Sequence, residues 1–217
     1  MFSQLAQTAV IFNTMRILKK VNQGDTYYEA YLGHYKKSGP EFYDLYHKLW
    51  ELGSHPNCPK RILEIGTRTG ISMCQLLSAY IDPSVIERIV CVDPFNDGYT
   101  SSKLVMANLK YLNLPWDKIH FKIGYSQDVL PQLLEAGETF DFILVDGDHS
   151  RDVARLDLEN AHKLLEKNGI LLFDDISDAP GECGLIVVWE EFKKAHENEY
   201  YTNESLSGKG LAWGVKK

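Results

Sequence analysis

The sequence predicts an α/β fold built on a mainly parallel sheet, with helices on both of its faces. From Arg61 onward, short apolar runs typical of buried strands alternate with stretches of helical periodicity. Such alternation indicates right-handed crossovers between parallel strands. The end of the chain departs from this pattern, because the turn-forming Ser207-Gly208-Lys209-Gly210 separates two strand-like segments. We therefore expect seven strands, with a C-terminal antiparallel hairpin.

Strands are expected where apolar residues follow one another, and helices where they recur every three to four positions. The expected strands are RILEIG from Arg61, RIVCVD from Arg88, KIHFKIG from Lys118, FDFILVDGD from Phe140, GILLFDD from Gly169, and segments 200–206 and 211–217. The expected helices cover residues 71–80, 101–112, 127–134, 153–165 and 184–196. The first 60 residues indicate a helical extension, so we expect two parts, 1–60 and 61–217.

Composition limits the classes of protein to consider. The chain has 217 residues, 44% of them hydrophobic and 24% charged, which fits one soluble α/β domain with a short extension. Its net charge of −7 argues against charge-driven binding to nucleic acid. The four cysteines form no C-x-x-C pair, so we interpret them as small buried apolar groups in a reducing compartment and expect a cytoplasmic protein.

The N-terminal extension has apolar residues at helical spacing, including Leu5, Ala9 and Phe12, and such stripes are usually packed core. It could also cap the sheet or cover a substrate. Its tyrosines and Trp50 suit an aromatic substrate pocket, a core or a homodimer interface equally well. Polar residues interrupt the apolar stretch and no basic segment precedes it, so we expect neither a signal peptide nor a membrane span.

Glu64 is a charge inside an apolar strand that ends in a glycine turn. A buried carboxylate is costly unless it has a partner, and a bound ligand could be that partner. Gly66 and Gly70 would let the backbone turn sharply and approach such a ligand. The segment from Arg61 to Gly70 therefore predicts a cofactor turn.

Carboxylates also end the other predicted strands, where ligands bind in folds of this class. Asp93 follows the second strand and could accept the hydroxyls of a ribose, or could simply cap a turn. Asp146 follows a later strand, and Asp174-Asp175 ends the next one. Three carboxylates at adjacent strand ends repel one another unless a cation or protons neutralise them, and an all-oxygen set favours Mg²⁺. The alternative is that one or more caps a helix or loop.

A nicotinamide cofactor would use a similar turn, but two details oppose it. The segment G-T-R-T-G from Gly66 lacks the G-x-G-x-x-G spacing, and Asp93 follows Gly66 by more than the usual roughly 20 residues. Glu64 would also repel a diphosphate, whereas it would complement a cofactor that carries ammonium and sulfonium charges.

The chain from Arg61 to Asp178 resembles the class I S-adenosylmethionine-dependent methyltransferases, and most of all the metal-dependent O-methyltransferases of the catechol and macrolide-sugar types. ILEIGTRTGIS resembles their cofactor turn, although Arg68 replaces the middle glycine of the commonest pattern. Gly124-Tyr125-Ser126-Gln127-Asp128 resembles the loop whose Ser-Gln pair contacts adenine, and Asp93 matches the ribose acid. The resemblance implies a Rossmann-like fold and an O-methyltransferase that acts on a small hydroxylated acceptor such as a sugar, polyketide or catechol.

The resemblance also implies roles for single residues. The metal, expected to be Mg²⁺, would be held by Asp146, Asp174 and Asp175, and His149 lies where these enzymes place a Lys or His base. A lone histidine is often only structural. S-adenosylmethionine would be bound by Glu64, Gly66, Thr67, Gly70, Ser72, Asp93, Ser126, Gln127 and Asp146.

The sequence also bears on three other functions. Amino-methylating DNA enzymes carry an Asn/Asp-Pro-Pro-aromatic run where this chain has Asp146-Gly147-Asp148-His149, so we expect no nucleic acid substrate. A nicotinamide-dependent oxidoreductase and a nucleoside-binding module without turnover remain the alternatives.

Overall fold

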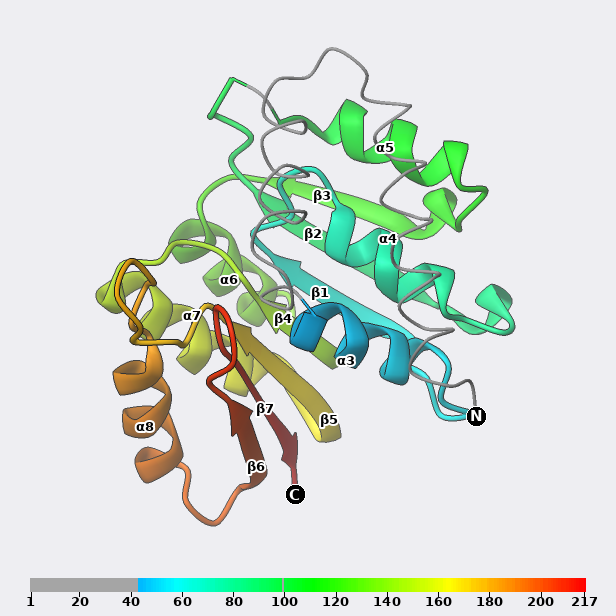
Figure 1. Ribbon diagram of the computed structural model, residues 1–217. Helices are drawn as coiled ribbons and strands as arrows, with labels where there is room; N and C mark the ends of the chain where they lie inside the picture. The colour runs from blue at the N-terminus through cyan, green and yellow to red at the C-terminus, as the bar shows by residue number, and fades with distance from the viewer. Residues whose placement is uncertain (1–42, 99) are drawn as a thin grey trace. The chain divides into compact units, whose positions relative to one another are not determined.

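The computed structural model describes residues 43–98 and 100–217 of the chain (Figure 1). Most of the predicted N-terminal extension therefore lies outside the described residues, and the division at residue 60 stays a prediction. The described chain forms two compact units. The sheet unit contains Pro59–Thr67, Ile86–Pro94 and Lys118–Lys217, and the helical unit contains residues 43–58 together with Arg68–Val85 and Phe95–Asp117, without residue 99.

The sheet unit holds one seven-stranded sheet in the order β3-β2-β1-β4-β5-β7-β6. The first five strands are parallel, whereas β7 runs antiparallel to both β5 and β6. This confirms the predicted class, a Rossmann-like mainly parallel sheet with flanking helices and a C-terminal hairpin. The strands are β1 (Arg61–Ile65), β2 (Arg88–Asp93), β3 (Ile119–Ile123), β4 (Phe140–Val145), β5 (Leu165–Asp174), β6 (Tyr200–Ser205) and β7 (Leu211–Lys216).

The strand order places the ligand-binding edge. Strand β1 pairs with β2 on one side and with β4 on the other, so the connections of the chain diverge at this point. In open α/β sheets, ligands bind beyond the carboxyl ends of the strands at such a switch point. The ends of β1, β2, β4 and β5 are therefore the positions to inspect.

Three helices of the sheet unit pack against the sheet: α6 (Ser126–Glu135), α7 (Arg151–Leu164) and α8 (Ile186–Ala195). Their apolar residues share one buried core with those of β1, β2, β4 and β5. Trp189 of α8 is fully buried in this core, and its ring stacks on Phe192 with the centroids 5.4 Å apart. Burial of such large rings supplies much of the stability of an α/β core.

The helical unit contains α3 (Tyr43–Gly53), α4 (Ile71–Ser78) and α5 (Ser102–Tyr111). Helix α3 approaches α4 so closely that a Cβ on Gly53 would lie 2.4 Å from the carbonyl oxygen of Leu76. The side-chain amide of Asn108, which is buried on α5, donates to the backbone oxygen of Thr69 at 3.0 Å and ties α5 to the turn before α4. Short 3₁₀ helices lie at Pro83–Val85 and at Trp116–Lys118.

The predicted helix and strand bounds agree with the structure to within a few residues, with one informative difference. Strand β5 starts at Leu165, which was expected to end a helix. Leu165 pairs with Phe140 on the far side of an irregularity in the β4–β5 ladder, and Asn168 has a left-handed φ of 64°. The polar residues between Leu165 and Gly169 conceal this start of the strand. No described helix has the length and apolar character that a membrane span requires.

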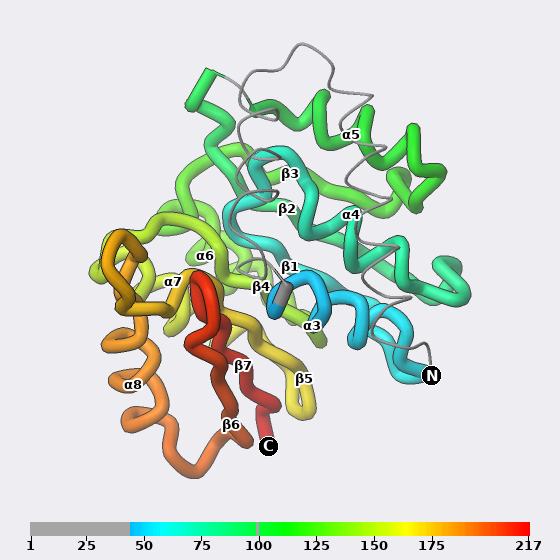
Figure 2. The backbone as a smooth tube through the Cα atoms, in the orientation of Figure 1, coloured from blue at the N-terminus to red at the C-terminus, as the bar shows by residue number. Residues whose placement is uncertain are grey.

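The C-terminal hairpin returns the chain to the edge of the parallel strands. Figure 2 shows β6 and β7, at the red end of the colour scale, running beside β5. Strand β7 pairs with β5 so that Leu211 lies opposite Asp174. The turn before Leu211 is therefore brought to the carboxyl end of β5.

Candidate active site

The turn after β1 brings the carboxyl ends of three strands together. The backbone N–H of Gly66 donates to Val92 of β2 at 2.9 Å, and that of Asp146 donates to Ile65 of β1 at 2.9 Å. Gly66 has a φ of +89°, and a Cβ there would lie 1.9 Å from the carbonyl oxygen of Asp146. Only glycine combines this conformation with so close an approach.

Glu64 is 1% exposed, in the middle of the sheet. Burial raises the pKa of its carboxyl to about 8, and the negative charges of Asp146 and Asp93 act in the same direction. The Thr67 hydroxyl and the Cys91 thiol, whose sulfur lies 3.8 Å from the Glu64 Oε2, offset this only in part. Glu64 is therefore largely neutral at pH 7 and poised to ionise if a cationic group binds beside it.

The other proposed cofactor residues lie at strand ends or helix starts. Asp93 ends β2 and is buried, and its backbone oxygen accepts the N–H of Gly124 at 3.2 Å. Ser126 and Gln127 begin α6, and Ser126 is nearly buried. Gly70 and Ser72 belong to the helical unit, where Gly70 has a left-handed φ of 73° and directly precedes α4.

Three carboxylates meet at the ends of β4 and β5. Asp146 follows β4, Asp174 ends β5 and Asp175 follows it, and one oxygen of each lies within 4.8 Å of the others. Burial, followed by the charges of Asp146 and Asp175, raises the pKa of Asp174 well above its usual range. Burial likewise raises the pKa of Asp146. The sequence predicted this convergence, and the repulsion is the property expected of a site for a hard cation.

Among the residues that the structure describes, two positive side chains contact this carboxylate cluster, and both bind Asp175. The Lys209 Nζ lies 3.0 Å from Oδ1 of Asp175, and the His149 Nε2 lies 2.9 Å from Oδ2. Burial alone would raise the pKa of Asp175, but His149 and Lys209 together lower it. The carboxylates of Asp146 and Asp175 in turn raise the pKa of His149 to about 10, although burial opposes this shift. His149 is therefore protonated at neutral pH while these carboxylates are ionised.

Sequence reasoning missed two residues of this site. Lys209 was assigned only to a tight turn, yet its side chain reaches Asp175 across the sheet edge. Cys183 was interpreted as a buried apolar group, which is wrong, because it is partly exposed and its sulfur lies 3.3 Å from the Nδ1 of His149. Cys58 is also partly exposed, whereas Cys74 and Cys91 are buried as expected. The sequence signal that could have indicated Lys209 is its position between two glycines, directly before the last strand.

Comparison with known proteins identifies the family. A family model described as "Methyltransferase domain" matches residues 63–176, which is more than half of the chain and includes the ends of β1, β2, β4 and β5. The chain belongs to this methyltransferase family. The resemblance predicted from the sequence is thereby confirmed.

The individual proteins compared with this methyltransferase below are each less than 30% identical to it. A Dictyostelium discoideum protein named "Probable caffeoyl-CoA O-methyltransferase 3" is 29% identical over 120 residues, which is 54% of this chain and 44% of the relative. The match thus spans less than half of that protein's length.

Two solved structures are similar in fold to this chain. The O-methyltransferase from Bacillus cereus, in complex with SAH, is 21% identical with a TM-score of 0.66, covering 93% of this chain and 91% of its own. The O-methyltransferase TomG from Streptomyces achromogenes, in complex with SAM and involved in tomaymycin synthesis, is 18% identical with a TM-score of 0.61, and the match covers both chains completely.

In this methyltransferase, Asp157 of α7 is a further buried carboxylic acid, and it lies beside Ser126 at the start of α6. Its side chain is fully buried, and burial raises its pKa to about 6 although the Ser126 hydroxyl favours the ionised form. A Cβ on Gly147 would lie 3.4 Å from one of its carboxylate oxygens. Asp157 therefore lies beside Ser126 and the turn after β4 and does not face solvent.

Proposed function

We propose that this methyltransferase moves a methyl group from S-adenosylmethionine to an oxygen of a small hydroxylated molecule, assisted by a divalent cation. The observation that carries the proposal is the three-carboxylate cluster with His149, beside a turn in which the buried Glu64 faces the negative charges of Asp146 and Asp93. The acceptor would be of the sugar, polyketide or catechol type. Membership of a methyltransferase family favours this function over a nicotinamide-dependent oxidoreductase.

The buried groups at the switch point fit S-adenosylmethionine. Its ammonium and sulfonium charges would complement the Glu64 carboxyl, which otherwise stays protonated because it is buried. Asp93 would accept the ribose hydroxyls, and Ser126-Gln127 would contact the adenine. Gly66 and Thr67 would present backbone to the methionine portion, Gly70 and Ser72 would complete the turn, and Asp146, directly after β4, would contribute to the cofactor site and to catalysis.

Asp146, Asp174 and Asp175 fit a hard divalent cation, because their oxygens converge and their charges repel one another. Such a cation, when bound, would lower the pKa of the acceptor hydroxyl. Lys209 is a tethered positive charge already on Asp175, so it partly neutralises the cluster and competes with any ion that binds there. Asp175 would have to exchange its contact with Lys209 for one with the ion.

His149 would act as the general base. It can accept a proton only in its neutral form, so its pKa has to fall from about 10 when the surrounding carboxylates are neutralised. The acceptor oxygen would then lose its proton to His149 and form the new bond to the methyl carbon while the bond from that carbon to sulfur breaks. The sulfonium would leave as a neutral thioether.

The first prediction tests methyl transfer. Incubation of the full chain with radiolabelled S-adenosylmethionine, Mg²⁺ and a panel of catechols, sugars and polyketides should label at least one hydroxylated acceptor. Replacing His149 with Ala should lower kcat about 10² to 10⁴-fold, the usual contribution of a general base, while cofactor affinity stays unchanged. His149→Ala with wild-type turnover would contradict the assigned role.

Asp152→Asn is the matched control, because its side chain is 96% exposed on the first turn of α7 and should leave turnover unchanged. If the protein binds the cofactor and labels none of the acceptors, the result would favour a nucleoside-binding module without turnover over the proposed enzyme.

The second prediction concerns proton release when the cofactor binds. Because Glu64 has a pKa of about 8, it is largely protonated at pH 7, and a cationic ligand beside it should drive its proton into solvent. Calorimetry with S-adenosylmethionine in buffers of different ionisation enthalpy should show release approaching one proton per cofactor.

Glu64→Gln should abolish this proton release and weaken binding, whereas Asp93→Asn should weaken binding and keep the release. Equal proton release from the wild type and Glu64→Gln would show that another group is responsible.

The third prediction concerns the competition between Lys209 and the cation. Lys209→Met should bind Mn²⁺ at least about tenfold more tightly, equivalent to about 1.4 kcal/mol, because a positive charge on Asp175 is removed. Titration followed by electron paramagnetic resonance measures free Mn²⁺ directly, without turnover.

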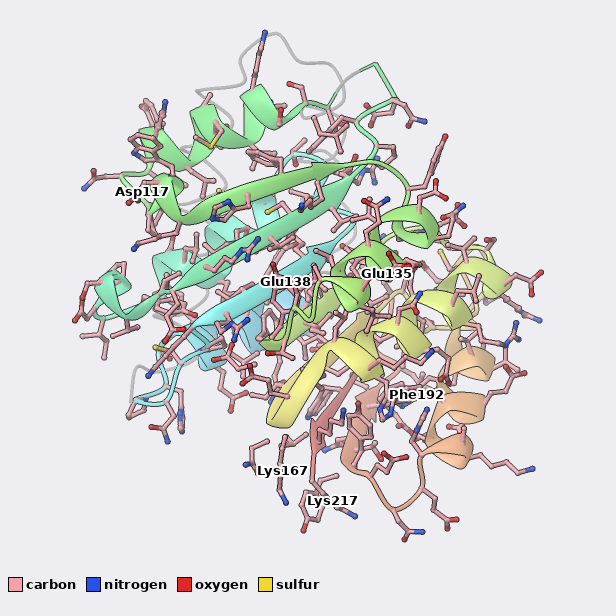
Figure 3. All side chains as sticks on the ribbon, turned by 180° about the vertical axis from the view of Figure 1, so that it is seen from behind. Asp117, Glu135, Glu138, Lys167, Phe192 and Lys217 are labelled. Carbon is pink, nitrogen blue, oxygen red and sulfur yellow. The ribbon has the colours of Figure 1, made fainter. Side chains whose placement is uncertain are left out.

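Lys167→Met is the control, because Lys167 is exposed near the start of β5, at the opposite end of the strand from Asp174 (Figure 3). Unchanged or weaker Mn²⁺ binding by Lys209→Met would refute the competition.

A further inference from the structure

Donors of three chemical types converge beside the carboxylate cluster. The sulfur of Cys183, a ring nitrogen of His149 and a carboxylate oxygen of Asp175 all lie within 4.8 Å of one another. They come from three segments: the turn after β4, the end of β5 and the loop before α8. Among the described residues, the other two clusters of potential metal ligands contain no cysteine, so this one differs in chemistry as well as in position.

The imidazole of His149 is oriented for a second partner. Its Nε2 is held by Oδ2 of Asp175 at 2.9 Å, while its Nδ1 faces the Cys183 sulfur at 3.3 Å. A carboxylate on one ring nitrogen is the usual device that fixes the orientation of a histidine whose other nitrogen binds a metal. This arrangement leaves Nδ1 and the sulfur side by side, as two ligands of one ion would be.

The loop that carries Cys183 is fixed on both sides of the cysteine. The N–H of Glu182 donates to the carbonyl oxygen of Ala179 at 3.0 Å, and the N–H of Gly184 donates to that of Ser177 at 2.8 Å. Because neighbours on both sides are tied to the backbone, the thiol is held near His149 by the fold of the loop.

The geometry points to a second, thiophilic cation site whose protein ligands are the Cys183 sulfur and the Nδ1 of His149, with Asp175 holding the other ring nitrogen. This site would take Zn²⁺ or another borderline divalent ion. Sulfur and imidazole ligands select such ions, whereas the all-oxygen set of Asp146, Asp174 and Asp175 suits Mg²⁺. On binding, the Cys183 thiol and the Nδ1 of the His149 imidazolium each lose a proton to solvent, and the thiolate and the ring nitrogen then bond to the ion.

Asp175 takes part in both sites, as a ligand of the all-oxygen site and as the carboxylate that holds His149 in the thiophilic site, so occupancy of one opposes occupancy of the other. This consequence rests on the proposed function, in which Asp175 and His149 serve the reaction. With a thiophilic ion on Nδ1 and Asp175 on Nε2, neither ring nitrogen of His149 could accept the proton of the acceptor hydroxyl. Zn²⁺ would therefore inhibit methyl transfer.

Cobalt absorption tests the site without any turnover. The full chain titrated with Co²⁺, in the absence of methyl donor and acceptor, should develop a thiolate-to-cobalt charge-transfer band in the near ultraviolet. One equivalent of Zn²⁺ should abolish the band. Cys183→Ser should lack it and should bind Zn²⁺ at least about tenfold more weakly.

Two variants separate this site from its neighbours. Cys58→Ser removes the other partly exposed thiol and should keep the band. Asp174→Asn alters only the all-oxygen set and should also keep it. The circular dichroism spectrum of each variant verifies that it folds.

Absence of the band in the folded wild type, or its persistence in Cys183→Ser, would overturn the inference. Because the measurement involves no methyl transfer, a failure of the proposed function would leave the cobalt band in place, and the two failures are distinguishable.

Discussion

Asp146, Asp174 and Asp175 lie so close together, the last two buried, that positive charge beside them is needed for all three to be ionised. Lys209 and His149 supply that charge, each on a separate oxygen of Asp175. The cluster is therefore held by opposite charges, and its ionisation state controls that of His149. An ion, a proton or a substrate that enters the site changes this balance for all five groups.

The sheet creates the cluster. The β4–β5 register pairs Val145 with Phe173, so the residues that follow them, Asp146 and Asp174, emerge at the same edge. The hairpin supplies Lys209, because its carbonyl oxygen accepts the N–H of Ser177 at 2.7 Å. Gly210 permits this contact, since it has a φ of +81° and a Cβ there would lie 2.5 Å from the nitrogen of Ser177. A backbone requirement of this one turn thus places the positive charge of Lys209 beside the carboxylate cluster.

The sequence alone was enough to predict the sheet, because apolar runs and helical periodicity are local features of the chain. Parallel topology then brings the carboxyl ends of the strands to one edge. For the same reason, the convergence of Asp146 with Asp174 could be predicted. The contacts of Lys209 and Cys183 could not, since each depends on how a loop packs some 34 residues from its partner in the sequence. The early start of β5 at Leu165 was missed because its pairing with Phe140 is not local.

The ionisation of His149 reports most directly on the balance of charge in this cluster. An NMR titration of its ring protons in the cation-free protein should give a pKa near 10, because the ionised Asp146 and Asp175 favour the imidazolium. Saturating Mg²⁺ should bring that pKa down toward 6.5, its ordinary value. A pKa near 6.5 both with and without Mg²⁺ would show that the carboxylates do not act on His149, and would contradict the account.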